Sequence, residues 1–164
     1  MLDRLKKHLG IAEVSTDVSA IQTELETLKV QFDGVQSNLV KASDSDNKTL
    51  FQDVITVNEA AQKSYVVGTV LGKVSATGKY KISVQNAADG SQTPVAVVVG
   101  DSFGTAAPFT VAATTDTKVL VLARGKVEVS KSALAFDASF DLQAELDAAY
   151  ASLAAVGILA VDAK

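Results

Sequence analysis

The sequence predicts an α+β fold: a small Val-rich, mostly antiparallel β domain with one C-terminal helix, preceded by an N-terminal coiled-coil helix. Two patterns carry this prediction. Apolar residues recur at heptad spacing early in the chain, and from residue 65 onward short Val-rich runs alternate with turn-forming residues before one helical stripe. We expect an amphipathic start over 1–10, a coiled-coil helix over 11–42, a linker and arm over 43–64, and the β/α domain over 65–164.

The first segment, MLDRLKKHLG, predicts a short amphipathic helix in which Leu2, Leu5 and Leu9 share a face and Gly10 ends the helix. It is either a frayed start or a docking peptide. It lacks the continuous apolar core of a signal peptide, and no stretch approaches the roughly 18 apolar residues of a membrane span. We therefore expect a soluble protein, made in the cytoplasm, with no membrane partner.

The second segment keeps a strict heptad repeat, in which the seam residues at positions a and d are Ile11, Val14, Val18, Ile21, Leu25, Leu28, Phe32, Val35 and Leu39. A period of 3.5 sustained over this length predicts a coiled coil rather than an ordinary surface helix, whose stripe drifts at 3.6. The other helical stretch, residues 141–156, is too short to cover the seam, so the partner is another copy of the chain. β-branched d residues such as Val14, Ile21 and Val35 favour a trimer over a dimer.

The third segment opens with SDSDNK, which is polar and typical of a linker. Asp44 and Asp46 imitate the start of a calcium loop, but Thr49 and Ile55 stand where such a loop needs Gly and Glu. Residues 50–57, LFQDVITV, have the composition of a strand. They could form a strand of the domain or a free arm, and the residues alone leave both alternatives open.

The fourth segment contains the predicted sheet and helix. YVVGTVLGKV, KYKISVQ, PVAVVVG, FTVAA and TKVLVLARGKVEVS read as strands of a compact sheet. In the helix over 141–156, Leu142, Leu146, Tyr150 and Leu153 form one stripe, Ser139 or Asp141 can cap the start, and Gly157 can end it. A last strand, ILAV, follows.

The sequence offers little to catalysis. His8 is the one histidine, there is no cysteine, and GTVLGKVS departs from a phosphate loop in glycine spacing and in the residue after Lys73. Asp89, Asp101, Asp116 and Asp137 lie among turn-forming residues, where a carboxylate is expected to cap a backbone amide. A net charge of −4 with scattered cations argues against nucleic-acid binding. We expect no metal, no cofactor and no enzymatic activity.

Residues 65–160 resemble the phage head decoration proteins of the lambda type. The resemblance is carried by VVGTVLGKVSATGKY, NAADGSQTPVAVVV, VLVLARGKVEVS and the helix leading into AAVGILA, in that order. It implies a homotrimeric structural protein of the virion that binds the major capsid protein outside an expanded icosahedral head, at three-fold and quasi-three-fold sites, and stabilises it. An arm preceding the domain is similar to the family's capsid-binding segment, which by position corresponds to Leu50, Phe51, Val54, Ile55 and Val57.

A long heptad region is absent from the shorter members of that family. The alternative function is a trimeric phage fibre or adhesin module that binds a host surface or glycan, because coiled coils also present receptor-binding heads. Fibre heads usually expose aromatic residues that stack on sugars, and this chain has few aromatic residues, with three Tyr and six Phe, which argues against that function. A glycan or host-cell binding assay would distinguish the two functions.

Overall fold

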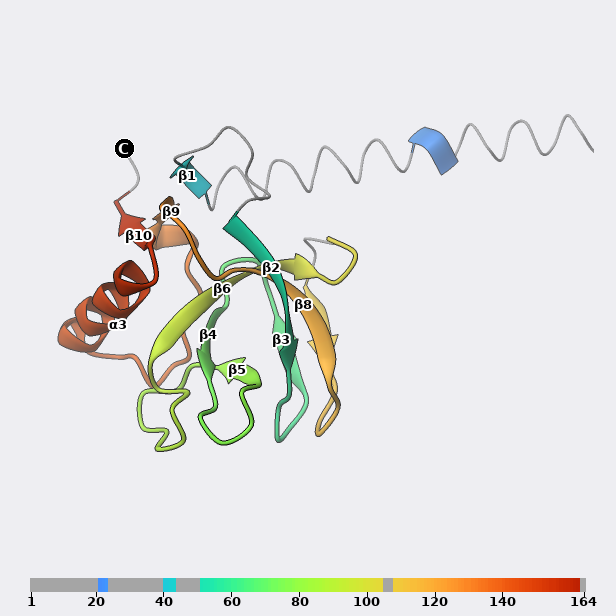
Figure 1. The fold of residues 1–164 in the computed structure, drawn as a ribbon, viewed down its shortest axis with the longest axis horizontal. Coiled ribbons are helices and arrows are strands. Elements are labelled where there is room, and N and C mark those ends of the chain that lie inside the picture. The colour runs from blue at the N-terminus through green and yellow to red at the C-terminus, as the bar shows by residue number, and fades with distance from the viewer. Residues whose placement is uncertain (1–20, 24–39, 44–50, 105–107, 163–164) are drawn as a thin grey trace, which may run out of the picture. The chain divides into compact units, whose positions relative to one another are not determined.

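The computed structural model describes residues 21–23, 40–43, 51–104 and 108–162. Contacts divide the chain into two units, Met1–Gly34 and Val35–Lys164. Within the second unit a closed barrel has the strand order β2-β5-β4-β6-β8 (Figure 1). Its strands are β2 (Gln52–Val57), β4 (Val70–Lys73), β5 (Tyr80–Ile82), β6 (Pro94–Asp101) and β8 (Thr117–Leu122).

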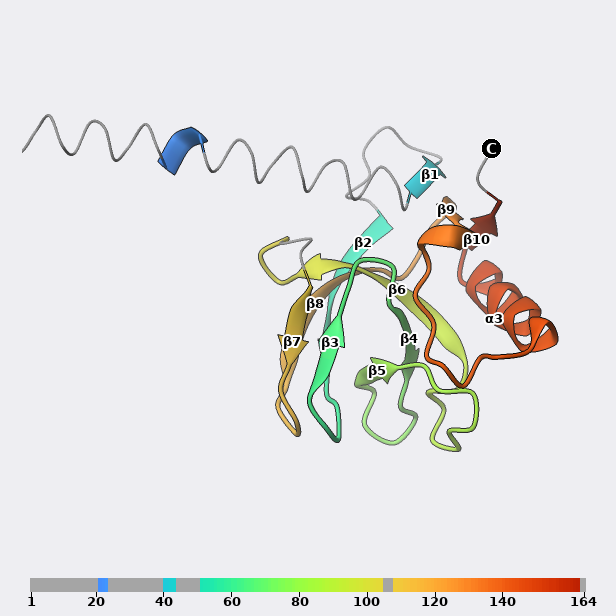
Figure 2. The same ribbon diagram turned by 180° about the vertical axis from the view of Figure 1, so that it is seen from behind.

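Two smaller sheets accompany the barrel. A three-stranded sheet has the order β1-β9-β10, formed by β1 (Val40–Ser43), β9 (Val127–Ser130) and β10 (Ile158–Val161). A two-stranded ribbon pairs β3 (Lys63–Tyr65) with β7 (Phe109–Val111). The 3-10 turn η2 (Lys131–Ala133) follows β9, and the helix α3 (Gln143–Ala155) contacts β10 and β6 beside the barrel (Figure 2). The prediction of a mostly β domain with one C-terminal helix is confirmed.

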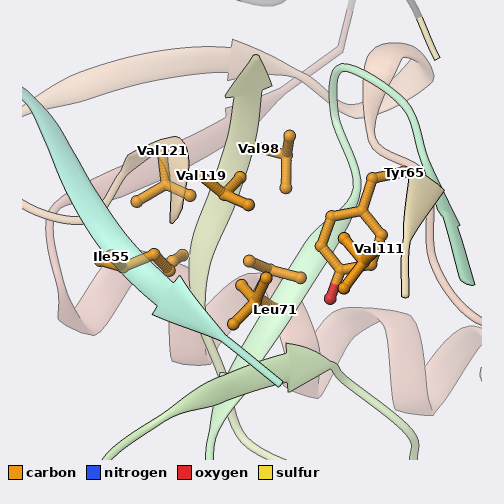
Figure 3. Close-up of a cluster of buried hydrophobic side chains, with 9 residues drawn as sticks. Ile55, Tyr65, Leu71, Val98, Val111, Val119 and Val121 are labelled. Carbon is orange, nitrogen blue, oxygen red and sulfur yellow. The ribbon is translucent and has the colours of Figure 1, made fainter. Parts of the chain in front are cut away.

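Alternating side chains of the barrel strands make the main core. Because successive residues of a strand point to opposite faces, every second residue enters the barrel. The buried cluster draws on β2, β3, β4, β6, β7 and β8 and consists of Ile55, Val57, Tyr65, Leu71, Ala96, Val98, Val111, Val119 and Val121 (Figure 3). Most of its members are β-branched, which suits them both to strands and to tight packing between strands.

Pairing between the named strands is mostly antiparallel, as predicted, with two exceptions among the described strands. β10 pairs parallel with β9 from Ile158↔Val127 to Val161↔Ser130, and β2 meets β5 parallel at Val57↔Tyr80. The first exception follows from the helix, because a chain that crosses over through α3 returns to the sheet in the parallel direction. The predicted last strand ILAV is therefore present as β10.

The helix α3 differs from its prediction at the start and agrees at the end. Leu142, expected on the buried stripe, is 59% exposed, whereas Ala149 and Leu153 are buried. Leu142 occupies the N-cap position, so neither Ser139 nor Asp141 caps the helix. The Leu142 N–H donates to Glu145 Oε2 at 3.3 Å. Gly157 follows the C-terminus with φ +90°, which confirms it as the residue that ends the helix.

The globular unit begins earlier in the chain than the predicted residue 65. Strand β1 pairs antiparallel with β9, although Val40–Ser43 overlaps the end of the predicted coiled-coil segment. Strand β2 lies within the stretch assigned to the arm. Tertiary pairing explains both differences, because Val40–Ser43 pairs with β9 and the strand-like stretch of β2 pairs with β8.

Candidate functional site

The predicted arm lies within the barrel. Each residue of β2 pairs antiparallel with β8, from Gln52↔Leu122 to Val57↔Thr117. Phe51 and Ile55 are each 8% exposed and Val57 is fully buried, while Val54 points outward and is 48% exposed. Of the two alternatives for this segment, the structure has a strand of the domain and not a free arm. Leu50 lies outside the described residues.

One edge of β2 carries little of the barrel's pairing. In the described ladder β5 meets β2 at Val57 alone, supplemented by a 2.9 Å hydrogen bond from Asn58 N–H to the Tyr80 carbonyl. Further up the strand, Val54 N–H donates to Asp53 Oδ1 at 2.9 Å. This side-chain acceptor faces solvent, so a peptide carbonyl could replace it. The edge of β2 around Val54 can therefore accept another strand.

At the start of β2, Phe51 lies against the turn at Gly125, and Gly125 lies against Gly157. We call these three residues the Phe51 junction. Gly125 has φ +84°, and a Cβ added there would overlap the Phe51 ring. A Cβ on Gly157 would overlap the carbonyl of Gly125. Gly125 belongs to the Arg-Gly motif after β8, and Gly157 to the Gly-Ile motif before β10. Close approach to the Phe51 ring thus explains the glycine after β8, and close approach to the Gly125 backbone explains the glycine before β10.

Glu59 forms a buried polar link that the sequence analysis missed. Its side chain is buried, and Oε1 accepts hydrogen bonds from Tyr65 Oη at 2.6 Å and from Ile82 N–H at 2.7 Å. Burial, reinforced by the hydrogen bond to Glu59, raises the pKa of Tyr65 well above its usual range. The link ties β3 to β5. Nothing in the stretch VNEAAQ distinguishes Glu59 from a loop residue, so only the tertiary structure identifies it.

Three of the singled-out aspartates have the predicted role in turns. Asp89 Oδ1 accepts from Ser91 N–H at 3.1 Å, Asp101 Oδ1 from Phe103 N–H at 2.9 Å, and Asp137 Oδ1 from Ser139 N–H at 3.0 Å. Each carboxylate therefore caps the amide two residues ahead, as in an Asx turn.

The fourth aspartate behaves differently. Asp116 Oδ1 accepts from Lys79 Nζ at 2.7 Å and Asn58 Nδ2 at 2.6 Å, so the prediction of a backbone cap is wrong there. These bonds, that of Lys79 first, lower the pKa of Asp116. The pKa of Asp89 is lowered mainly by its bond to Lys81 Nζ. Among the residues the structure describes, no three His, Cys, Asp or Glu side chains gather as metal ligands.

Exposed apolar side chains mark surfaces that a partner could cover. In the described part of the domain they are Val54, Val66, Phe103, Leu142 and Leu159, with exposures of 48%, 37%, 93%, 59% and 48%. Phe103 stands apart, because an aromatic side chain is almost fully in water. The sequence DSFG has the Asp and Gly positions of a type I turn, which is the signal that could have indicated an exposed Phe103.

Most of the predicted coiled-coil interface lies outside the described residues, namely Ile11, Val14, Val18, Leu25, Leu28, Phe32, Val35 and Leu39. Ile21 is described. It lies in a helical segment, residues 21–23, and is 61% exposed in the single chain. No helix in the described ranges is both long enough and apolar enough to cross a membrane.

Comparison with known proteins identifies the family. The family model described as bacteriophage lambda head decoration protein D matches residues 42–158, well over half of the chain. The match starts in β1 and ends at the first residue of β10, so it includes β2 and the Phe51 junction. No curated protein matches the sequence. The family's role is structural, in decorating the phage capsid, and not enzymatic. The chain belongs to the family of bacteriophage lambda head decoration protein D.

Proposed function

We propose that the protein is a homotrimeric cement protein, which binds the outside of an expanded icosahedral phage head at three-fold and quasi-three-fold sites and stabilises it. The family match over residues 42–158 carries this proposal. A trimer that binds only the expanded lattice stabilises it by mass action, and three linked contacts act at high effective concentration. Binding sites shared among several capsid subunits would hold those subunits together.

The heptad segment supports the trimer. Its β-branched d positions favour three strands, and an isolated helix with such a seam is only marginally stable in water. Ile21 is consistent with this role, because it lies in a helical segment and most of its side chain is exposed in the single chain. The same helix from two sister chains would cover it.

The edge of β2 around Val54 is our candidate contact with the major capsid protein. Phe51, Ile55 and Val57 are buried in the domain, so their side chains serve packing. Val54 and the main-chain groups beside it remain for a partner. Strand addition draws affinity from main-chain hydrogen bonds, and alternate side chains set the register. A capsid segment added here would continue the barrel where its own pairing is sparse.

The proposal is tested by mixing purified protein with expanded and unexpanded shells that lack it, and measuring bound protein by sedimentation. Light scattering gives the oligomeric state. We expect a trimer that binds expanded shells only. Equal binding to both shells, or to neither, contradicts the proposal. Binding to glycans or host cells without binding to shells would instead favour the fibre or adhesin function.

The β2 contact has its own pair of variants. Val54→Pro removes the backbone N–H that would donate a hydrogen bond to a capsid carbonyl, whereas Val54→Ala shortens the side chain and keeps that N–H. Proline is tolerated at sheet edges whose N–H points away from the partner strand. We expect Val54→Pro to weaken shell binding more than Val54→Ala does, with trimer mass unchanged in both. Equal binding by the two variants would exclude main-chain pairing at this edge.

A further inference from the structure

A tight turn after β6 displays Phe103 to solvent. The Gly104 N–H donates to the Asp101 carbonyl at 3.0 Å, closing a four-residue turn, and the Asp101 carboxylate accepts the Phe103 N–H. Gly104 has φ +80°, a conformation that glycine adopts without strain. The backbone at Phe103 is therefore fixed by the turn, and ordering of the loop costs little when a partner covers the exposed side chain.

The chain on the C-terminal side of Phe103 carries no charge, whereas Asp101 lies two residues before it. From Ser102 to Thr115 the chain reads SFGTAAPFTVAATT, without one charged residue, although 21% of the whole chain is charged. The cores of protein interfaces are depleted of charge and enriched in aromatic residues. Its immediate neighbours, Ser102 and Gly104, are small. A protruding ring between small residues fits a pocket in a partner, not a flat surface.

The position of the turn in the barrel indicates which partner would cover Phe103. The turn lies at the end of the barrel where β2 begins, and the turns that follow β2 and β7 lie at the opposite end, in both views (Figures 1 and 2). The exposed Val54 belongs to the same strand, β2. The Phe103 turn is thus at the end where the segment with the proposed capsid contact enters the barrel.

We propose that Phe103 inserts into an apolar pocket of the major capsid protein, as an anchor separate from the strand contact at β2. This inference rests on the proposed function and deepens it. Aromatic anchors in desolvated pockets dominate the affinity of many interfaces. Removing the ring from such a pocket weakens binding by about tenfold to a hundredfold per site.

The test compares full-length Phe103→Ser, Phe103→Leu and Leu142→Ser with the unchanged protein. Leu142→Ser is the matched control, because it removes an exposed apolar side chain at the start of α3. Affinity for expanded shells is measured by titration, and oligomeric state by light scattering. We expect Phe103→Ser to bind at least tenfold more weakly, Phe103→Leu to recover part of the loss, and Leu142→Ser to bind normally, with all variants trimeric.

Each other outcome overturns the proposal in a distinguishable way. If Phe103→Ser binds shells as the unchanged protein does, Phe103 is no anchor, and the decoration function stands. If Phe103→Ser loses the trimer, the pocket belongs to a second copy. Equal losses in Phe103→Ser and Leu142→Ser show a general effect of apolar surface. Failure of the unchanged protein to bind any shell refutes the decoration function itself.

Discussion

Replacing Glu59 by Ala should destabilise the domain more than any other single change of a charged residue in the described barrel. The substitution leaves two donors, Tyr65 Oη and Ile82 N–H, without their acceptor. Each buried donor left unpaired costs about 1–3 kcal/mol, so we expect a loss of about 2–6 kcal/mol in the free energy of unfolding. Since small domains are stable by only about 5–15 kcal/mol, this loss is a large fraction of the total.

Urea denaturation at one fixed protein concentration measures the loss, because the stability of an oligomer depends on concentration. Glu59→Gln keeps an acceptor oxygen of the same shape and should cost clearly less than Glu59→Ala. Glu128→Ala, at the partly exposed position of the otherwise buried strand β9, should change stability by less than about 0.5 kcal/mol. A loss below about 1 kcal/mol in Glu59→Ala would refute the reasoning, since it would mean that the two donors are not sealed from water.

Three further predictions follow from the same structure. Gly125→Ala should lower the unfolding free energy by about 2 kcal/mol or more, because its Cβ meets the Phe51 ring. Gly78→Ala, at φ +69° with Lys73 Cε at an ordinary contact distance of 3.8 Å, should cost about 1 kcal/mol, and equal losses in the two variants would exclude the contact with Phe51. Because folding raises the pKa of Tyr65, the unfolded chain releases the Tyr65 proton above about pH 10 while the folded chain keeps it. The free energy of unfolding should therefore fall by about 1.4 kcal/mol per pH unit above that pH. Tyr65→Phe should lack this part of the pH dependence, and an identical pH dependence in both proteins would contradict the burial of Tyr65. Deleting residues 1–34 should make the trimer dissociate at higher protein concentration in analytical ultracentrifugation, whereas unchanged dissociation would make the helix dispensable for assembly.

The parts of the fold that the sequence predicted have local signals. Valine runs separated by turn residues mark β4, β6 and β8, and the position of Gly157 marks the end of α3. The three Asx turns were also predictable, because an aspartate two residues before its amide is a local arrangement. Each of these features depends on a few neighbouring residues and hardly on the rest of the chain.

The parts that were missed depend on distant partners. LFQDVITV fits a free strand-like arm as well as a barrel strand, and only pairing with β8 decides between them. Leu142 continues the helical stripe in the sequence, yet it precedes the first turn of α3 and is 59% exposed among the described residues. Glu59 is recognisable only when Tyr65 and the Ile82 amide are brought beside it.

A density map of expanded heads decorated with this protein tests the central claim most directly. We predict three-fold symmetric density on the outer surface at the three-fold and quasi-three-fold positions, with a capsid segment alongside the Val54 edge of β2. Unexpanded heads treated in the same way should lack that density. Density at other positions, density without three-fold symmetry, or bare expanded heads at saturating protein would contradict the account.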